Sequence, residues 1–262
     1  MDRYLKTYRC IFKMNVKALM IYEADFIVGV IAMIFKTLIN FSILLVLFNK
    51  IDNIRAWNFD EMLFLYGFST TSFALWHCFF INTITIPIYI KTGELDRFLL
   101  MPQNPLFLII SEGFDEDGWG ELLLAVVISV IAIIRLEISG VILILLPLLY
   151  FASSFIYAGI SIFLSCFAFF TVENTDLTDL TMNLNEFAKY PIDIYSKFLK
   201  IIFSFVLPIG FASYFPSLIF LKAVNSFNIL MLIATFVVSI GFFVIAFKFW
   251  MLCLKKYTSA GT

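Results

Sequence analysis

Long runs of apolar residues alternate with short polar segments along this chain of 262 residues. Met62–Ile90 contains 29 residues without Asp, Glu, Lys or Arg, and Ile138–Val172 contains 35. About 20 apolar residues suffice for a helix to span a bilayer. The pattern therefore predicts an all-α membrane protein with six transmembrane helices. The expected spans are residues 26–49, 62–88, 119–135, 139–171, 199–221 and 226–254.

Basic residues are distributed unevenly between the two sides that six spans would create. An even number of spans places both termini on one side, and twelve of the sixteen basic residues outside the spans then lie on that side. Because cytoplasmic segments carry the excess of Lys and Arg, both termini are predicted to be cytoplasmic. The twelve are Arg3, Lys6, Arg9, Lys13, Lys17, Lys91, Arg97, Lys189, Lys197, Lys200, Lys255 and Lys256. The four on the outer side are Lys50, Arg55, Arg135 and Lys222.

Residues 1–25 combine regularly spaced basic residues with apolar ones. The basic residues follow one another at intervals of three, four and four positions, which gathers their charges on one side of a helix. They are Lys6, Arg9, Lys13 and Lys17. An amphipathic helix on the inner leaflet is predicted, ahead of a six-span domain at residues 26–256. Two roles stay open: a platform for a cytoplasmic partner, and an anchor that fixes the first span.

Composition and motifs limit the classes of function. Hydrophobic residues make up 62% of the chain and charged residues 14%, against about 25% charged residues in soluble domains. The net charge of -1 provides no basic field for nucleic acid. The chain has one histidine, four scattered cysteines and no G-x-x-x-x-G-K-[ST] loop. We therefore expect no metal site, no catalytic residues and no nucleotide hydrolysis by that route on this chain. The cysteines are Cys10, Cys78, Cys166 and Cys253.

Two inner segments outside the membrane have room for helices, residues 89–118 between the second and third expected spans and residues 172–198 between the fourth and fifth. Within the first of these, Thr92 has the residue type of an N-cap, and Glu94 and Asp96 fall in the first turn, where the helix dipole favours acids. Pro102 ends the helix at or before Met101. A short helix is therefore predicted from Thr92 to Met101.

The apolar side of this short helix offers a surface for another protein. Leu95, Phe98 and Leu99 share one face at helical spacing. Such a face at the bilayer surface can press into a groove of a partner, or it can simply lie in the interface while the helix joins two spans. Spacing alone leaves both interpretations open.

The chain resembles the ABC-2-type permeases, which are the membrane subunits of ATP-binding-cassette exporters. The resemblance rests on several short motifs in matching order: Gly93-x-Leu95-Asp96-x-x-Leu99-Leu100-x-Pro102-x-Asn104-Pro105, Phe114-Asp115-x-x-Gly118-x-Gly120-Glu121, Glu186-Phe187-x-x-Tyr190-Pro191 and Phe205-Val206-Leu207-Pro208. It implies a separate ATPase subunit that holds ATP and Mg, a second permease chain, and a coupling helix between spans two and three. The expected coupling residues are Gly93, Glu94, Leu95, Asp96, Arg97, Phe98, Leu100 and Pro102.

Two polar side chains lie inside expected spans. Lys36 falls near the middle of the first span, where a lysine costs about 2.5–3.5 kcal/mol on insertion scales. We expect it to face protein or water, on the substrate route or against a partner group, unless the span is misplaced and it reaches an interface. His77 is interpreted as a hydrogen-bonded packing histidine, because no acid falls in its own span.

Two further segments have unusual polarity or helix breakers. Five acids precede the third span and are expected to be a solvated entry to it, since their spacing does not match a calcium loop. They are Glu112, Asp115, Glu116, Asp117 and Glu121. Pro208 and Pro216 interrupt the fifth span. Either the chain dips back from the outer face there as a lid on the route, as the resemblance implies, or the span is merely kinked.

The function expected from these observations is the transmembrane subunit of an ATP-driven exporter. The alternative is a stand-alone channel or a secondary transporter, although the latter normally shows broken helices in both halves. A membrane-embedded enzyme is the weakest possibility. We expect a multi-pass protein of a bacterial cell membrane, in contact with lipid and not with nucleic acid.

Overall fold

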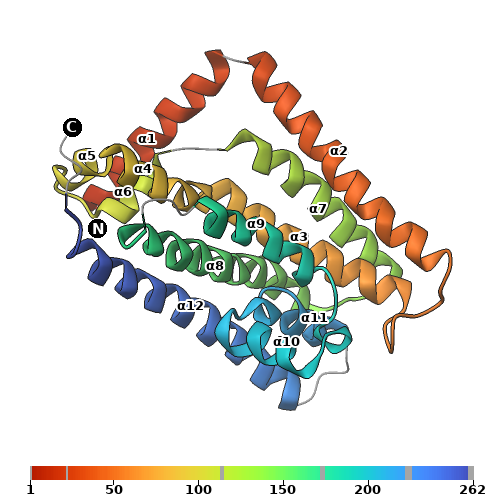
Figure 1. Cartoon of the computed structure of the whole chain (residues 1–262). Helices are drawn as coiled ribbons and strands as arrows, with labels where there is room; N and C mark the ends of the chain where they lie inside the picture. Colours follow the sequence, from red (N-terminus) through yellow and green to blue (C-terminus); the bar gives the residue numbers. More distant parts are fainter. Residues whose placement is uncertain (1, 22, 113–114, 172–174, 222–225, 259–262) are drawn as a thin grey trace.

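The computed structural model describes residues 2–21, 23–112, 115–171, 175–221 and 226–258, and these residues contain helices and no β-strand (Figure 1). Five helical segments are long and apolar enough to cross a membrane, and a bent pair is a sixth candidate. This confirms an all-helical membrane protein. The five segments contain α2 (Glu23–Phe48), α3 (Phe59–Phe80), α7 (Glu116–Arg135), α8 (Leu146–Ser165) and α12 (Ser226–Leu254).

Helix α3 occupies the centre of the bundle and packs mainly against α7 and α8. It begins with a capping box, in which Asn58 accepts from the Glu61 amide and the Glu61 side chain accepts from the Asn58 amide, each at 2.9 Å. Its side chains are buried on all sides, as expected for a helix that is apolar around its whole circumference. In contrast, α2 and α12 lie at opposite sides of the bundle and bury few of their apolar residues completely.

Glycines allow the closest helix contacts. A Cβ at Gly67 would lie 2.6 Å from Ser129 Oγ, where α3 meets α7. A Cβ at Gly120 would lie 2.5 Å from the carbonyl oxygen of Val30, where α7 meets α2. Small residues at such positions let helices in a membrane approach closely. The arrangement of α2, α3 and α7 therefore depends on these two glycines.

The bundle has two ends, which we call the α5 end and the Trp57 end. The α5 end contains α1 (Asp2–Ile21), α4 (Ile86–Thr92), α5 (Leu95–Leu99), α6 (Pro105–Ser111) and the last described residues after α12 (Figure 1). The Trp57 end contains the loop between α2 and α3. At that end the Arg135 side chain forms an ion pair with Asp60, 2.5 Å between Nε and Oδ1.

Helix α9 (Thr175–Ala188) corrects the expected topology. Residues 172–198 were expected to be an inner segment outside the membrane, but their described part lies beside α3 and α8 and runs toward the Trp57 end (Figure 1). Asn185 Oδ1 accepts from Ser69 Oγ and from Tyr157 OH, both at 3.4 Å, near the middle of α3 and α8. The sequence prediction missed α9 because it is too short and too polar for a conventional span.

The next segment lies at the Trp57 end. Asp193 accepts a hydrogen bond from the Tyr214 hydroxyl at 2.6 Å, and the Tyr214 ring lies 5.7 Å from that of Trp57. Lys200 Nζ lies 3.5 Å from Asp193 Oδ1. Lys189, Lys197 and Lys200 were expected at the same end as the termini, and this expectation is wrong. Among the described residues outside the spans, nine basic residues then lie at the α5 end and six at the Trp57 end. The excess of Lys and Arg at the α5 end is therefore smaller than expected, but it still indicates that this end is cytoplasmic.

The expected fifth span is a bent pair of helical segments, Lys197–Val206 and Ile209–Leu221, which meet at an angle of 72°. Pro208 stands at the bend, where it cannot donate a backbone hydrogen bond. The first segment ends in a π-helical turn, Ile202–Val206. Pro216 lies within α11 (Tyr214–Leu221) and is buried. A bend of this size fits either a broken span or a segment that dips back from the outer face.

Candidate functional site: the α5 end and the polar face of α9

A sharp turn at Gly93 creates the short helix at the α5 end. Gly93 has φ of 77°, a left-handed conformation that glycine adopts without steric cost, and its amide donates to the Ile90 carbonyl. Thr92 was expected to cap the next helix, but it is the last residue of α4 and its hydroxyl donates to the Ile88 carbonyl at 3.0 Å. Helix α5 is therefore shorter than expected and begins at Leu95.

The apolar side of α5 faces the interior of this chain. Leu95 and Phe98 are buried in a cluster that includes Trp250 of α12 and Ile109 of α6. The expectation that these two residues form a free docking face is therefore wrong. The most exposed apolar side chain of this segment is that of Leu100, at 88% exposure. Its neighbours Leu99, Met101 and Pro102 are exposed as well.

Polar contacts hold α5 rigidly between α4 and α6. Arg97 forms an ion pair with Glu112, and its guanidinium carbon lies 4.6 Å from the centre of the Phe98 ring. The Tyr89 hydroxyl donates to Glu112 at 3.2 Å. Asn104 caps α6 by accepting from the Leu106 amide at 2.9 Å. Of the other expected coupling residues, Glu94 is exposed and Asp96 is half-buried.

Helix α1 packs on this assembly. The Gln103 side chain donates to the Thr7 hydroxyl at 3.2 Å, and the rings of Tyr4 and Phe107 meet edge to face at 4.9 Å. The amino-terminal segment is therefore helical and connects the α4–α6 region to the first span. Its role as a platform or as a topological anchor stays a prediction.

A buried cluster of His77, Asp115 and Glu121 links α3 to the start of α7. His77 Nε2 lies 3.2 Å from Asp115 Oδ2, and Nδ1 lies 3.4 Å from Glu121 Oε2. Each ring nitrogen therefore lies within hydrogen-bond distance of one carboxylate, and the imidazole bridges the two acids. Burial by itself would raise the pKa of Asp115, but the hydrogen bond from His77 and its positive charge lower this pKa below the ordinary value.

This cluster corrects part of the sequence interpretation. His77 is hydrogen-bonded within the core, as predicted, but its acids come from α7 and not from its own helix. Glu121 is therefore buried and not part of a solvated surface, Asp115 is half-buried, and Glu112 pairs with Arg97. Among the described residues, no group of His, Cys, Asp and Glu has the arrangement of a metal site.

One face of α9 is polar and exposed although the helix lies beside the middle of the bundle. Besides Leu177 and Phe187, the exposed residues that the structure describes on α9 are polar and recur at intervals of three, four and three positions, so they share one side of the helix. They are Asp176, Asp179, Asn183 and Glu186. The opposite side, with Thr181, Leu184 and Asn185, is buried against α3 and α8. The sequence contains the signal for this face, but a polar helix was interpreted as a loop outside the membrane.

Lys36 has a comparable position on α2. It lies near the middle of the helix, on the exposed side, while the neighbouring Thr37 is buried. Lys36 was expected inside the bundle or at the seam between two subunits, and within this single chain it is exposed. Lys36, Pro208 and Pro216 were grouped as residues of a route or lid, but they lie on separate elements.

The sequence was compared with protein families and with curated proteins. Residues 32–261 match the family described as ABC-2 family transporter protein. The match covers the five long helical segments, apart from the first turns of α2, together with α9 and the bent pair. No curated protein matches this chain.

Proposed function

The chain belongs to the ABC-2 family of transporters, and we propose that it is the membrane subunit of an ATP-driven exporter, coupled to a separate ATPase at the α5 end. The α5 end is then cytoplasmic, as the remaining excess of basic residues favours. ATP and Mg would be bound by the partner ATPase. The protein is a multi-pass membrane protein, and we further propose that its membrane is the bacterial cell membrane.

The observation that carries this proposal is the polar face of α9. Polar side chains at membrane depth face the interior of an assembly or a water-filled cavity, because hydrocarbon does not solvate them. Asp179, Asn183 and Glu186 are not covered by this chain. We infer that they line the substrate route, with α9 and the bent pair acting together as the fifth spanning element and its outer lid.

A second permease chain would complete this route. One copy leaves the polar face of α9 open, and it also leaves Lys36 exposed in the middle of α2. A facing copy, or a related chain, would enclose the α9 face and keep lipid away from it. Lys36 would lie at the seam between the chains or on the route.

The α5 end has the structure needed to transmit movement from an ATPase. Helix α5 is buried on one side against Trp250 and is fixed on the other by the Arg97–Glu112 pair. A partner that pushes on Leu100 would therefore move α4 and α6 together with α5. Because α4 continues into α3, such a movement reaches the centre of the bundle.

Thiol labelling tests the route directly. In a variant without the four native cysteines, Asn183→Cys on the polar face of α9 is compared with Ile233→Cys, which is 55% exposed on α12. A thiol in hydrocarbon does not form the reactive thiolate. We expect a water-soluble methanethiosulfonate reagent to label Asn183→Cys at least ten times faster in membranes. Equal and slow labelling of both positions would contradict an aqueous route along α9.

A further inference from the structure

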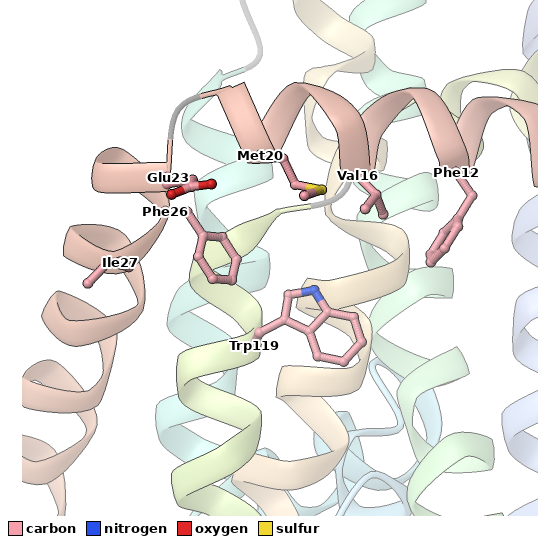
Figure 2. A pocket seen from close by; sticks show the side chains of 7 residues that line it. All are labelled: Phe12, Val16, Met20, Glu23, Phe26, Ile27 and Trp119. Atoms are coloured by element: carbon pink, nitrogen blue, oxygen red, sulfur yellow. The ribbon is translucent and has the colours of Figure 1, made fainter.

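An open apolar hollow lies at the elbow between α1 and α2. It has a volume of about 470 Å³, within the range of pockets that hold small ligands. Six of its seven lining residues are apolar (Figure 2). The lining residues are Phe12, Val16, Met20, Glu23, Phe26, Ile27 and Trp119.

The hollow is built from three helices that meet at the α5 end. Figure 2 shows Phe12, Val16 and Met20 hanging from α1 toward the indole of Trp119 on α7, with Phe26 of α2 beside it. Large parts of these side chains are exposed, 65% for Met20 and 36% for Trp119. Because α1 runs across the ends of the spans, the hollow opens at the level of the membrane surface, where tryptophan is enriched.

A row of positive charge borders this apolar face. Phe12, Val16 and Met20 follow one another every fourth residue and form one row along α1. The adjacent row, about 100° further around the helix, carries Lys13 and Lys17, which are both exposed. An apolar hollow beside two ammonium groups complements a molecule with a hydrocarbon chain and a phosphate.

We propose that the elbow hollow binds one acyl chain of a glycerophospholipid whose phosphate is held by Lys13 and Lys17. A second copy of this chain is a poorer occupant, because its own α1 would bring like charges against these lysines. Glu23 stands at the mouth and opposes a net anionic headgroup, so its removal strengthens binding. A lipid bound there would fix the angle between α1, which packs on α6, and the first span.

Tryptophan quenching provides the test. Trp119 is 36% exposed, while Trp57 is 6% exposed and Trp76 and Trp250 are fully buried. Phosphatidylglycerol with brominated acyl chains is titrated into the full-length chain, purified with its accompanying subunits, in phosphatidylcholine nanodiscs. Diacylglycerol with the same brominated chains is the phosphate-free comparison, and Trp119→Phe defines the part of the signal that comes from the hollow.

We expect brominated phosphatidylglycerol to quench Trp119 at lower concentration than brominated diacylglycerol does. Each lysine near a membrane surface contributes about a fivefold factor in affinity for an anionic lipid. Lys13→Gln combined with Lys17→Gln should therefore weaken binding about thirty-fold. The control pair, Lys6→Gln with Lys255→Gln, removes the same charge from the α5 end away from the hollow and should change binding less than threefold.

Two more variants have opposite expected effects. Glu23→Gln should strengthen binding of phosphatidylglycerol, and Val16→Phe should block the hollow and abolish the phosphate-dependent quenching. Equal quenching of Trp119 by the two lipids, equal effects of the two lysine pairs, or no quenching of Trp119 would overturn the proposal. Transport is not measured in this experiment, so the result does not depend on the proposed exporter function.

Discussion

Removing the His77 side chain should destabilise the bundle strongly, because it leaves a buried carboxylate without its partner. The His77 side chain is 7% exposed and that of Glu121 is 9% exposed. Breaking one member of a buried charged pair costs about 3–5 kcal/mol. The separation of 3.4 Å between His77 Nδ1 and Glu121 Oε2 is long for a charge-assisted hydrogen bond, which places the expected loss near the lower limit, about 3 kcal/mol.

A double-mutant cycle measures this loss in the free energy of unfolding, by titration with a denaturing detergent in mixed micelles. His77→Gln alone and Glu121→Gln alone should each destabilise the chain, and the double variant should recover at least about 1 kcal/mol relative to the sum of the single effects. His77→Phe together with Glu121→Gln tests whether the packing of a ring against Trp76 is enough to keep the bundle as stable as the wild type without the charged pair. The cluster is not a structural ion pair if the free energies of unfolding of both single variants differ from that of the wild type by less than about 0.5 kcal/mol, a rough limit for surface substitutions.

Three further variants test other parts of the structure. Gly120→Ala brings a Cβ within 2.5 Å of the Val30 carbonyl and should lower the stability by about 1–3 kcal/mol in the same titration, whereas Gly241→Ala, with nothing within 4 Å, should be neutral or stabilising. Lys36→Met should leave the stability of the isolated chain unchanged but reduce transport by the assembled complex; unchanged transport would remove Lys36 from the route. Asp115 stabilises the fold above the pKa of an unfolded aspartate, about 4, and this contribution is lost as the pH falls through its lowered folded-state pKa. Asp115→Asn should therefore lose less stability than the wild type as the pH falls from 5 to 3, roughly the interval around the pKa of an unfolded aspartate, and an unchanged acid profile would argue against the His77 contact.

The long apolar helices were predictable because the signal for them is local. Twenty apolar residues in a row can be recognised without knowing what they pack against. Helix α9 was missed for the opposite reason. Its polar residues are compatible with membrane depth because α3 and α8 bury one side and the proposed route would solvate the other, and both conditions depend on the assembled bundle.

The candidate site shows the same limit. The sequence marked the segment around Gly93–Pro102 as a short helix, although it placed the amino-terminal end at Thr92, and it could not show which side of that helix is buried. Leu95 and Phe98 face Trp250, which lies about 150 residues later in the chain. The partners of His77 were missed because the contacts with Asp115 and Glu121 cross between helices, and spacing within one helix does not contain that information.

The central claim is that a separate ATPase binds at the α5 end, and co-purification of that subunit tests it most directly. The decisive variant is Leu100→Asp, because Leu100 is 88% exposed and its substitution leaves the core intact. Its matched control is Val141→Asp, which is 80% exposed near the Trp57 end. The account predicts that the wild type and Val141→Asp purify from mild detergent with a nucleotide-hydrolysing subunit, and that Leu100→Asp purifies folded but without it. Purification of the wild type without any such subunit, together with transport that needs no ATP, would contradict the account and favour a stand-alone channel or secondary transporter.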